Sequence, residues 1–193
     1  SDESRGLGDV YKRQSQTWMA MTALDANRAK AQVANKCNLE ISDIKKMTIW
    51  GNHSPTMYPD LDNAEIKGES ASGWINDQNW IESDFLRIVQ QRGKAIIDAR
   101  GASSATSAAN AAIDTVKATL SETPADDWFS AAVLSDGSYN VPEGLIFGFP
   151  LKADANGKVS IVQDLPISDY AQEKIDLTTK ELLDERSDIQ DLL

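Results

Sequence analysis

A switch from helical to strand period near residue 120 narrows the range of possible folds for this sequence most strongly. Before the switch, apolar residues recur at helical spacing in two stretches, 78–99 and 104–120, and Asp77 is a suitable N-cap for the first. Gly93 lies inside that first stretch. Because glycine costs about 1 kcal/mol against alanine in a helix, it indicates a bend or a close backbone contact. After the switch, short runs separated by turns predict strands at 128–134, 144–151 and 158–162.

Turn signals between the predicted strands indicate how the strands pair. Asn156-Gly157 is a strong hairpin signal, and Asp136-Gly137 marks a second turn. Strands joined by tight turns pair antiparallel. Helical spacing returns after Ser168, a suitable N-cap, and continues almost to the last residue. The sequence therefore predicts an α+β fold in which long helices pack on a mostly antiparallel sheet.

The first third of the chain predicts one helix and one short strand. Residues 15–36 show helical spacing without a breaker, and Asn38 is expected to end this helix. Residues 47–50 form a β-branched and aromatic run that predicts a buried strand. Loop-forming residues dominate from 54 to 73, with a short strand expected at 64–66.

Composition and charge limit the class of protein and its partners. With 193 residues, 41% of them hydrophobic, the chain suits one globular domain. A formal net charge of −11 argues against binding nucleic acid or an anionic membrane, and no apolar run is long enough to span a membrane. The single cysteine, Cys37, cannot form an intrachain disulfide, which fits a reducing compartment. We therefore expect a cytoplasmic protein, and we predict no metal site.

The candidate catalytic residue is His53, the only histidine in the chain, because it follows a predicted strand directly. Loops on a rigid scaffold often carry chemistry, and imidazole takes and releases protons near neutral pH. Upstream, Asp25 and Arg28 stand three residues apart, on one face of the predicted helix. A carboxylate can orient an imidazole, and a guanidinium can hold a substrate carboxylate. The alternatives are a histidine that only caps a turn and an ordinary surface ion pair.

Four motifs stand out along the chain. They are MTALDANRAK at 21–30, MTIWGNHS at 47–54 with YPD at 58–60, RG at 92–93 with ARGASSA at 99–105, and SDGSY at 135–139 with PEGL at 142–145. In this order they resemble the malate dehydrogenase family, specifically its cytosolic-type branch. The resemblance runs from about Gln16 to the last residue and implies the C-terminal, substrate-binding portion of such an enzyme, whose fold agrees with the α+β prediction.

The resemblance implies a role for each candidate residue. His53 is the proton acceptor in the reversible, NAD-dependent oxidation of (S)-malate to oxaloacetate, and Asp25 orients and supports it. Arg28 binds the carboxylate beside the reacting carbon, and Ser103 is a further candidate for the substrate pocket. The family is usually homodimeric, so we expect a homodimer of the full-length enzyme.

Parts of the family pattern do not occur in this chain. No GxGxxG phosphate-binding motif is found, and the mobile loop whose two arginines read the second carboxylate is missing. We therefore expect NAD to be bound mainly by an N-terminal domain outside the sequence. Residues 1–14 do not match the family and are expected to be a non-native, poorly ordered leader, with residues 15–193 forming the substrate domain. Two alternatives stay open: a lactate dehydrogenase-like enzyme, and a non-catalytic fragment or interaction module.

Overall fold

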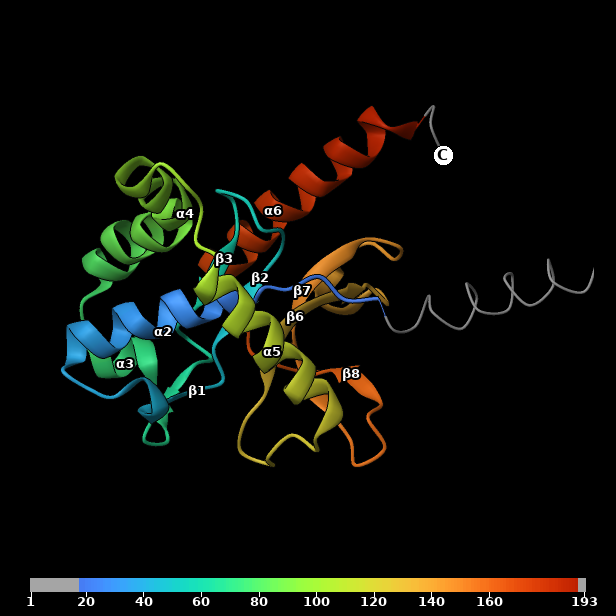
Figure 1. Cartoon of the computed structure of the whole chain (residues 1–193). Coiled ribbons are helices and arrows are strands. Elements are labelled where there is room, and N and C mark those ends of the chain that lie inside the picture. Colours follow the sequence, from blue (N-terminus) through green and yellow to red (C-terminus); the bar gives the residue numbers. More distant parts are fainter. Residues whose placement is uncertain (1–17, 191–193) are drawn as a thin grey trace, which may run out of the picture.

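The computed structural model describes residues 18–190, which form helices around short antiparallel strands (Figure 1). The helices are α2 (Ala23–Cys37), α3 (Ala71–Ile75), α4 (Leu86–Arg100), α5 (Thr106–Leu120) and α6 (Asp169–Asp188), with shorter turns η1 (Ile41–Asp43), η2 (Trp80–Phe85) and η3 (Ser138–Asn140). The strands are β1 (Ile44–Lys45), β2 (Thr48–Trp50), β3 (Tyr58–Asp60), β4 (Glu65–Ile66), β5 (Glu69–Ser70), β6 (Phe129–Leu134), β7 (Ile146–Ala153) and β8 (Val159–Ile161). The predicted α+β class is confirmed.

Three small sheets take the place of the one predicted sheet, and all their strand pairs are antiparallel. The strand orders are β6-β7-β8, β2-β3 and β1-β4-β5. A backbone bridge between Gly51 and Gly148 links the β2-β3 sheet to the β6-β7-β8 sheet. The Gly148 N–H donates to the Gly51 carbonyl at 2.8 Å, and the Gly51 N–H donates to the Gly148 carbonyl at 3.3 Å. The end of β2 is therefore held against β7.

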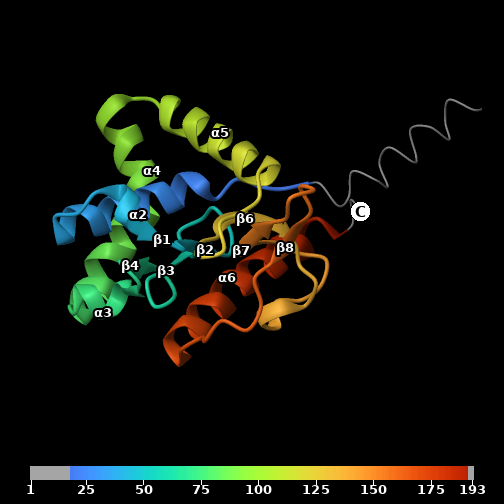
Figure 2. The same ribbon diagram turned by 90° about the horizontal axis from the view of Figure 1, so that it is seen from below.

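Helices lie on both sides of the central strands. α2 and α5 cover one side of β6 and β7, and α6 lies on the other (Figure 2). Two apolar clusters result. In the first, Ala29 and Val33 of α2 pack with Ile49 and Phe85, and in the second Ile175 of α6 packs with aromatic side chains of β7. The strand β2 contributes to both clusters, so its position depends on both cores.

The elements predicted for the second half of the chain agree closely with the structure. The helix expected at 78–99 is present as η2, a wider π-helical turn, followed by α4, and the Trp80 N–H donates to Asp77 Oδ1 at 3.0 Å. The helix expected at 104–120 is α5, and the three predicted strands are β6, β7 and β8. Ser168 caps α6 by accepting the Ala171 N–H at 3.2 Å.

The helix predicted at 15–36 begins later than expected, at Ala23. Described residues 18–22 are not helical, and Ala20 forms a two-bond backbone bridge with Ala132 of β6, at 2.9 and 2.8 Å. Next to this bridge, the buried hydroxyls of Thr22 and Ser130 lie 2.9 Å apart. Pairing with a strand more than 100 residues away therefore overrides the local helical spacing.

Other expectations for the first half were incomplete. Asn38 does end α2, in a left-handed conformation with φ of 54°, and β4 lies within the expected strand at 64–66. The predicted loop at 54–73 also contains β3, β5 and the start of α3. The strand β3 contains Pro59, a residue that argues against a strand, and it pairs only with β2. The leader predicted at residues 1–14 lies outside the described residues.

None of the helices between residues 18 and 190 is both long and apolar enough to span a membrane.

The contact between β2 and β7 makes Gly148 a sensitive position. A Cβ there would lie 2.5 Å from the Ile49 carbonyl oxygen and 2.8 Å from that of Gly51. We expect Gly148→Ala to lower the free energy of unfolding by about 1–3 kcal/mol, because the two strands must separate to admit the methyl group. Chemical denaturation followed by circular dichroism measures the change.

Gly73→Ala is the matched control. Its Cβ would meet nothing closer than 4.0 Å, and the residue lies within helix α3. We expect this change to be neutral or to stabilise by about 0.5–1 kcal/mol, because alanine favours helix. Equal stability of the two variants would contradict the close contact.

Candidate active site

His53 stands in the loop that follows β2, on a rigid base. The last residue of β2, Trp50, is fully buried and donates its indole N–H to Asp60 Oδ2 at 3.0 Å. Its ring also meets Tyr139 edge to face, with centroids 4.8 Å apart. The chain then turns at Gly51, where φ is +94°, and the side chain of His53 emerges 61% exposed. The strand is therefore held by the core while the imidazole reaches solvent.

The structure brings together His53 and Asp25, as predicted. The His53 Nδ1 lies 2.5 Å from Asp25 Oδ2, and the Asp25 side chain is fully buried. Arg28, one turn further along α2, donates from Nη1 to the other carboxylate oxygen at 3.1 Å. A buried carboxylate is costly unless it is paired, and here both oxygens have partners. The ring of His53 therefore does more than cap a turn.

The electrostatic setting of His53 favours its protonated form. The hydrogen bond with Asp25 raises the pKa of His53 above the usual value of about 6.5, although partial burial lowers it. The negative charge of Asp25 raises the pKa further, and the positive charge of Arg28 lowers it. With Nδ1 as the donor to Asp25, the lone pair of Nε2 is available, and no residue between 18 and 190 hydrogen-bonds to that atom. The pair can thus accept a proton at Nε2 and stabilise the imidazolium that results.

Arg28 also lines a groove of about 740 Å³ between α2, α4 and α5. A second guanidinium, that of Arg92, lines the same groove together with the carboxylate of Asp114, so the lining holds two cations and one anion in a chain of net charge −11. Gly93, predicted to mark a bend or a close backbone contact, faces Arg28, and a Cβ there would lie at an ordinary van der Waals distance of 3.8 Å from Arg28 Nη1. With two guanidinium groups the groove can attract an anion, and guanidinium groups bind carboxylates and phosphates in bidentate pairs.

Ser103, the further candidate for the substrate pocket, is exposed and does not line this groove, whereas its neighbour Ser104 does. Arg92 and Ser104 were not assigned roles from the sequence. Arg92 stands in one of the motifs that carry the resemblance, but a lone arginine on a helix is not a signal by itself. The two serines are neighbours just before α5, and helical spacing could not predict that Ser104, rather than Ser103, lines the groove.

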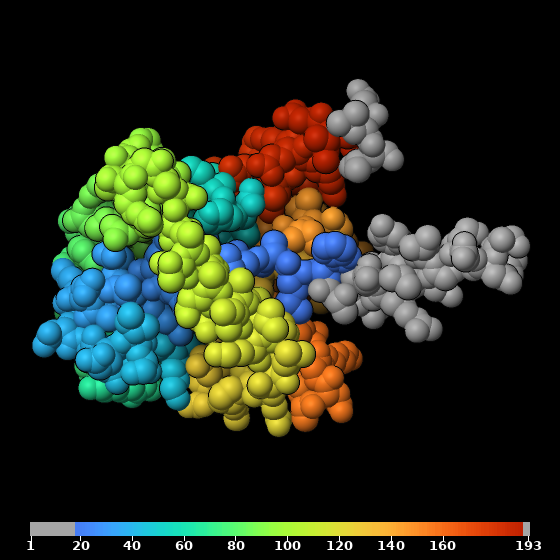
Figure 3. Space-filling view, viewed as in Figure 1, coloured from blue at the N-terminus to red at the C-terminus, as the bar shows by residue number. Residues whose placement is uncertain are grey.

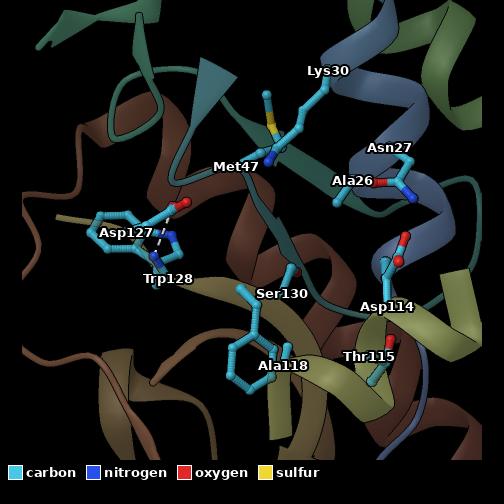
Figure 4. Close-up of a pocket in the computed structure, with 12 residues that line it drawn as sticks. Ala26, Asn27, Lys30, Met47, Asp114, Thr115, Ala118, Asp127, Trp128 and Ser130 are labelled. Carbon is cyan, nitrogen blue, oxygen red and sulfur yellow. Dashed lines mark hydrogen bonds between the residues drawn. The ribbon is translucent and has the colours of Figure 1, made fainter. Parts of the chain in front are cut away.

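A second, smaller cavity of about 290 Å³ lies between α2, α5 and the start of β6 (Figure 4). The amine of Lys30 lines it, and burial lowers the pKa of Lys30 while the charge of Asp127 opposes that change. None of His53, Asp25 and Arg28 lines this cavity, so it is separate from the histidine site. No group of three His, Cys, Asp or Glu residues within 18–190 is arranged to hold a metal ion.

Comparisons with known proteins relate this chain to one family of enzymes. Residues 22–192 match the family model of the lactate/malate dehydrogenase alpha/beta C-terminal domain. The structure is similar to malate dehydrogenase from Naegleria fowleri, with 42% identity, a TM-score of 0.85, and coverage of 92% of this chain and 54% of that one. It is similar to Trichomonas vaginalis lactate dehydrogenase in complex with NADH and oxamate, with 30% identity, a TM-score of 0.85, and coverage of 92% and 55%.

A third similarity, to malate dehydrogenase from Plasmodium falciparum, has 23% identity and a TM-score of 0.78, covers 92% of this chain and 56% of that one, and shows the fold alone. The chain therefore spans about half the length of the solved structures that it matches.

The single histidine makes the Asp25 contact directly measurable. We expect an NMR titration of the one imidazole to give a pKa above 6.5, and Asp25→Asn to lower it, because the amide carries no charge to support the imidazolium. Asp84→Asn, which removes an exposed partner of Arg87, is the control and should leave the His53 pKa unchanged.

The same contact links stability to pH. The folded pKa of His53 lies above its unfolded value, so its stabilising contribution is complete below about pH 6.5 and is lost as pH rises through the folded pKa. Denaturation at a series of pH values should show this loss, and it should be absent in Asp25→Asn. The effect is small because the imidazole is largely exposed and solvent screens it. A His53 pKa at or below 6.5 would contradict the proposed pairing.

Proposed function

Because this chain belongs to the lactate/malate dehydrogenase family, we propose that it is the substrate-binding and acid–base part of an NAD-dependent malate dehydrogenase. The observation that carries the proposal is the contact between Asp25 and His53, with Arg28 on the same carboxylate. These three residues occupy the positions that the resemblance assigns to the proton acceptor, its partner and the carboxylate-binding arginine.

In the proposed reaction, the free Nε2 of His53 takes the proton of the substrate hydroxyl, and Asp25 stabilises the imidazolium. In the reverse direction, the protonated ring donates to the ketone oxygen. Arg28 binds the carboxylate beside the reacting carbon and orients the substrate, which converts an encounter into an aligned reaction. Arg92, in the same groove, adds positive charge that attracts a dicarboxylate.

When bound, NAD supplies the hydride acceptor for the carbon that carries the hydroxyl. A hydride acceptor without a base would leave a protonated ketone, and His53 is a base with one free ring nitrogen and an exposed face. The residues of this chain fit the proton half of that chemistry. We propose that most contacts to NAD come from an N-terminal domain, since no GxGxxG motif occurs in this sequence.

Two observations support malate over lactate as the substrate. The identity to the Naegleria malate dehydrogenase is 42%, against 30% to the Trichomonas lactate dehydrogenase. The motif from Trp50 to Ser54 also resembles the malate enzymes. Lactate is the second candidate, because both solved structures superpose equally well, with TM-scores of 0.85. The ratio of kcat/KM for oxaloacetate and pyruvate separates the two.

We expect the 193-residue chain alone to show no oxaloacetate-dependent oxidation of NADH, and an N-terminal nucleotide-binding half supplied in cis to restore it. Aligned binding of two reactants is worth about 7–11 kcal/mol of barrier, so its loss removes many decades of rate. In the restored enzyme, His53→Asn should lower kcat by about 10²–10⁴-fold and leave NADH binding intact. Arg28→Ala should lower kcat/KM for oxaloacetate.

Arg87→Ala is the control for both variants, because Arg87 forms an exposed ion pair and lies in neither the groove nor the histidine site. Its kinetics should match those of the wild type. Robust turnover by the chain alone, or a His53→Asn enzyme with wild-type kcat, would overturn the proposal.

We propose that the full-length enzyme is a homodimer in which α5 contributes to the interface. This helix lies on the outside of the molecule (Figure 3). Its outer side carries Ile113, Val116 and Leu120, which are 55, 56 and 78% exposed. Apolar residues at that spacing form a continuous stripe along one side of the helix, and exposure of such a stripe to water is unfavourable. A second copy of the chain would cover it.

Light scattering coupled to gel filtration tests this assignment in the full-length enzyme. Val116→Asp should give a monomer, because a carboxylate in an apolar interface is costly. Leu177→Asp is the control, since Leu177 is a similarly exposed apolar residue on α6. A dimer that survives Val116→Asp would place the interface elsewhere.

A further inference from the structure

The loop that carries His53 is anchored to helix α6 at two points. At its start, the Asn52 N–H donates to Thr178 Oγ1 at 3.1 Å. Beyond His53, Ser54 Oγ donates to Glu181 Oε2 at 2.5 Å, and the Thr56 hydroxyl donates to the same oxygen. Both anchors come from one turn of α6, more than 120 residues away in sequence. One face of the helix therefore holds the loop on both sides of the histidine.

We propose that Glu181 is a positioning residue for His53: by accepting the hydroxyls of Ser54 and Thr56, it holds the imidazole where Asp25 can reach it. This inference rests on the proposed acid–base role of His53. Glu181 touches no reacting atom in this proposal, and it acts only through the loop.

The need for such an anchor follows from how little else holds the ring. The side chain of His53 is largely exposed, and among residues 18–190 its ring hydrogen-bonds only to Asp25. Its own backbone N–H donates to the neighbouring Asn52 Oδ1, within the same loop. The bridge from Gly51 to Gly148 fixes the loop before His53 but not after it. The Glu181 contacts supply the restraint on the far side.

The chemistry of the anchor suits a carboxylate. One ionised oxygen accepts two hydroxyl donors, and hydrogen bonds to a charged acceptor are about twice as strong as neutral ones. The Ser54 and Thr56 hydroxyls also lie 2.9 Å from each other, so the three side chains form one network. Ser54 Oγ further accepts the Thr56 N–H at 3.1 Å, which stiffens the turn. Loss of the acceptor would leave both hydroxyls without their common partner.

The test is an NMR pH titration of the one imidazole in the 193-residue chain, which reports on His53 without any need for turnover. We expect Glu181→Ala to move the His53 pKa back toward 6.5 and to change the ring ¹⁵N shifts, because the contact with Asp25 loosens. Glu181→Gln should retain most of the wild-type behaviour, since its amide oxygen still accepts both hydroxyls. Glu185→Ala, an exposed residue one turn further along α6, is the matched control and should change nothing.

The glutamine variant separates positioning from charge. Removal of a negative charge would by itself lower the His53 pKa, and it would do so equally in Glu181→Ala and Glu181→Gln. Equal shifts in the two variants would therefore overturn the inference, and so would a wild-type titration in Glu181→Ala. A variant that only lost stability would lower the melting temperature and leave the titration of the folded chain unchanged, which also counts against positioning.

If Glu181→Ala does not fold, Ser54→Ala and Thr56→Val each remove one donor and leave the carboxylate in place. Each should shift the His53 pKa in the same direction by a smaller amount, and wild-type values in both would overturn the inference. The proposed dehydrogenase function fails on a different result, namely full activity of His53→Asn in the complete enzyme. The two failures are therefore distinguishable.

Discussion

The close approach of Gly51 and Gly148 is the constraint on which the site depends. These residues exchange two backbone hydrogen bonds, and neither position has room for a side chain. On Gly148 a Cβ would meet the carbonyls of β2, and on Gly51 it would lie 2.2 Å from the hydroxyl of Thr178. Strand β7 and helix α6 therefore both reach the end of β2, and the loop with His53 leaves from the point where they meet.

The second physical theme is the pairing of one buried charge. Asp25 lies in the first turn of α2, fully buried, where an unpaired carboxylate would be strongly unfavourable. Arg28 supports one oxygen and His53 the other. The carboxylate of Asp25 is therefore buried in the protein, whereas the titratable imidazole of His53 faces the solvent. That polarity suits a residue that must exchange a proton with a substrate while its charge is balanced from behind.

The arrangement also separates two tasks in space. In the proposed function the loop after β2 carries the proton chemistry, whereas the groove between α2, α4 and α5, where Arg28 and Arg92 lie, attracts the anion. Arg28 connects the two, because it contacts Asp25 and lines the groove. Helix α6 contributes to the site without supplying a reacting group, through Thr178 and Glu181.

The amino-acid sequence alone predicts the α+β class, the helices on either side of Gly101, the three strands after residue 120, and the cap at Ser168. These features rest on local signals, namely period, turn residues and capping groups. It also singled out His53, Asp25 and Arg28 and predicted that Asp25 meets His53.

The tertiary structure decided what depends on partners distant in sequence. The bridge at Ala20 and the strand at Pro59 exist because β6 and β2 pair with them. The division into three sheets, the choice of Ser104 over Ser103 in the groove, and the anchor at Glu181 likewise follow from long-range packing. No local period encodes a hydrogen bond between residues 127 positions apart, such as that from Ser54 to Glu181, so only the folded chain could reveal it.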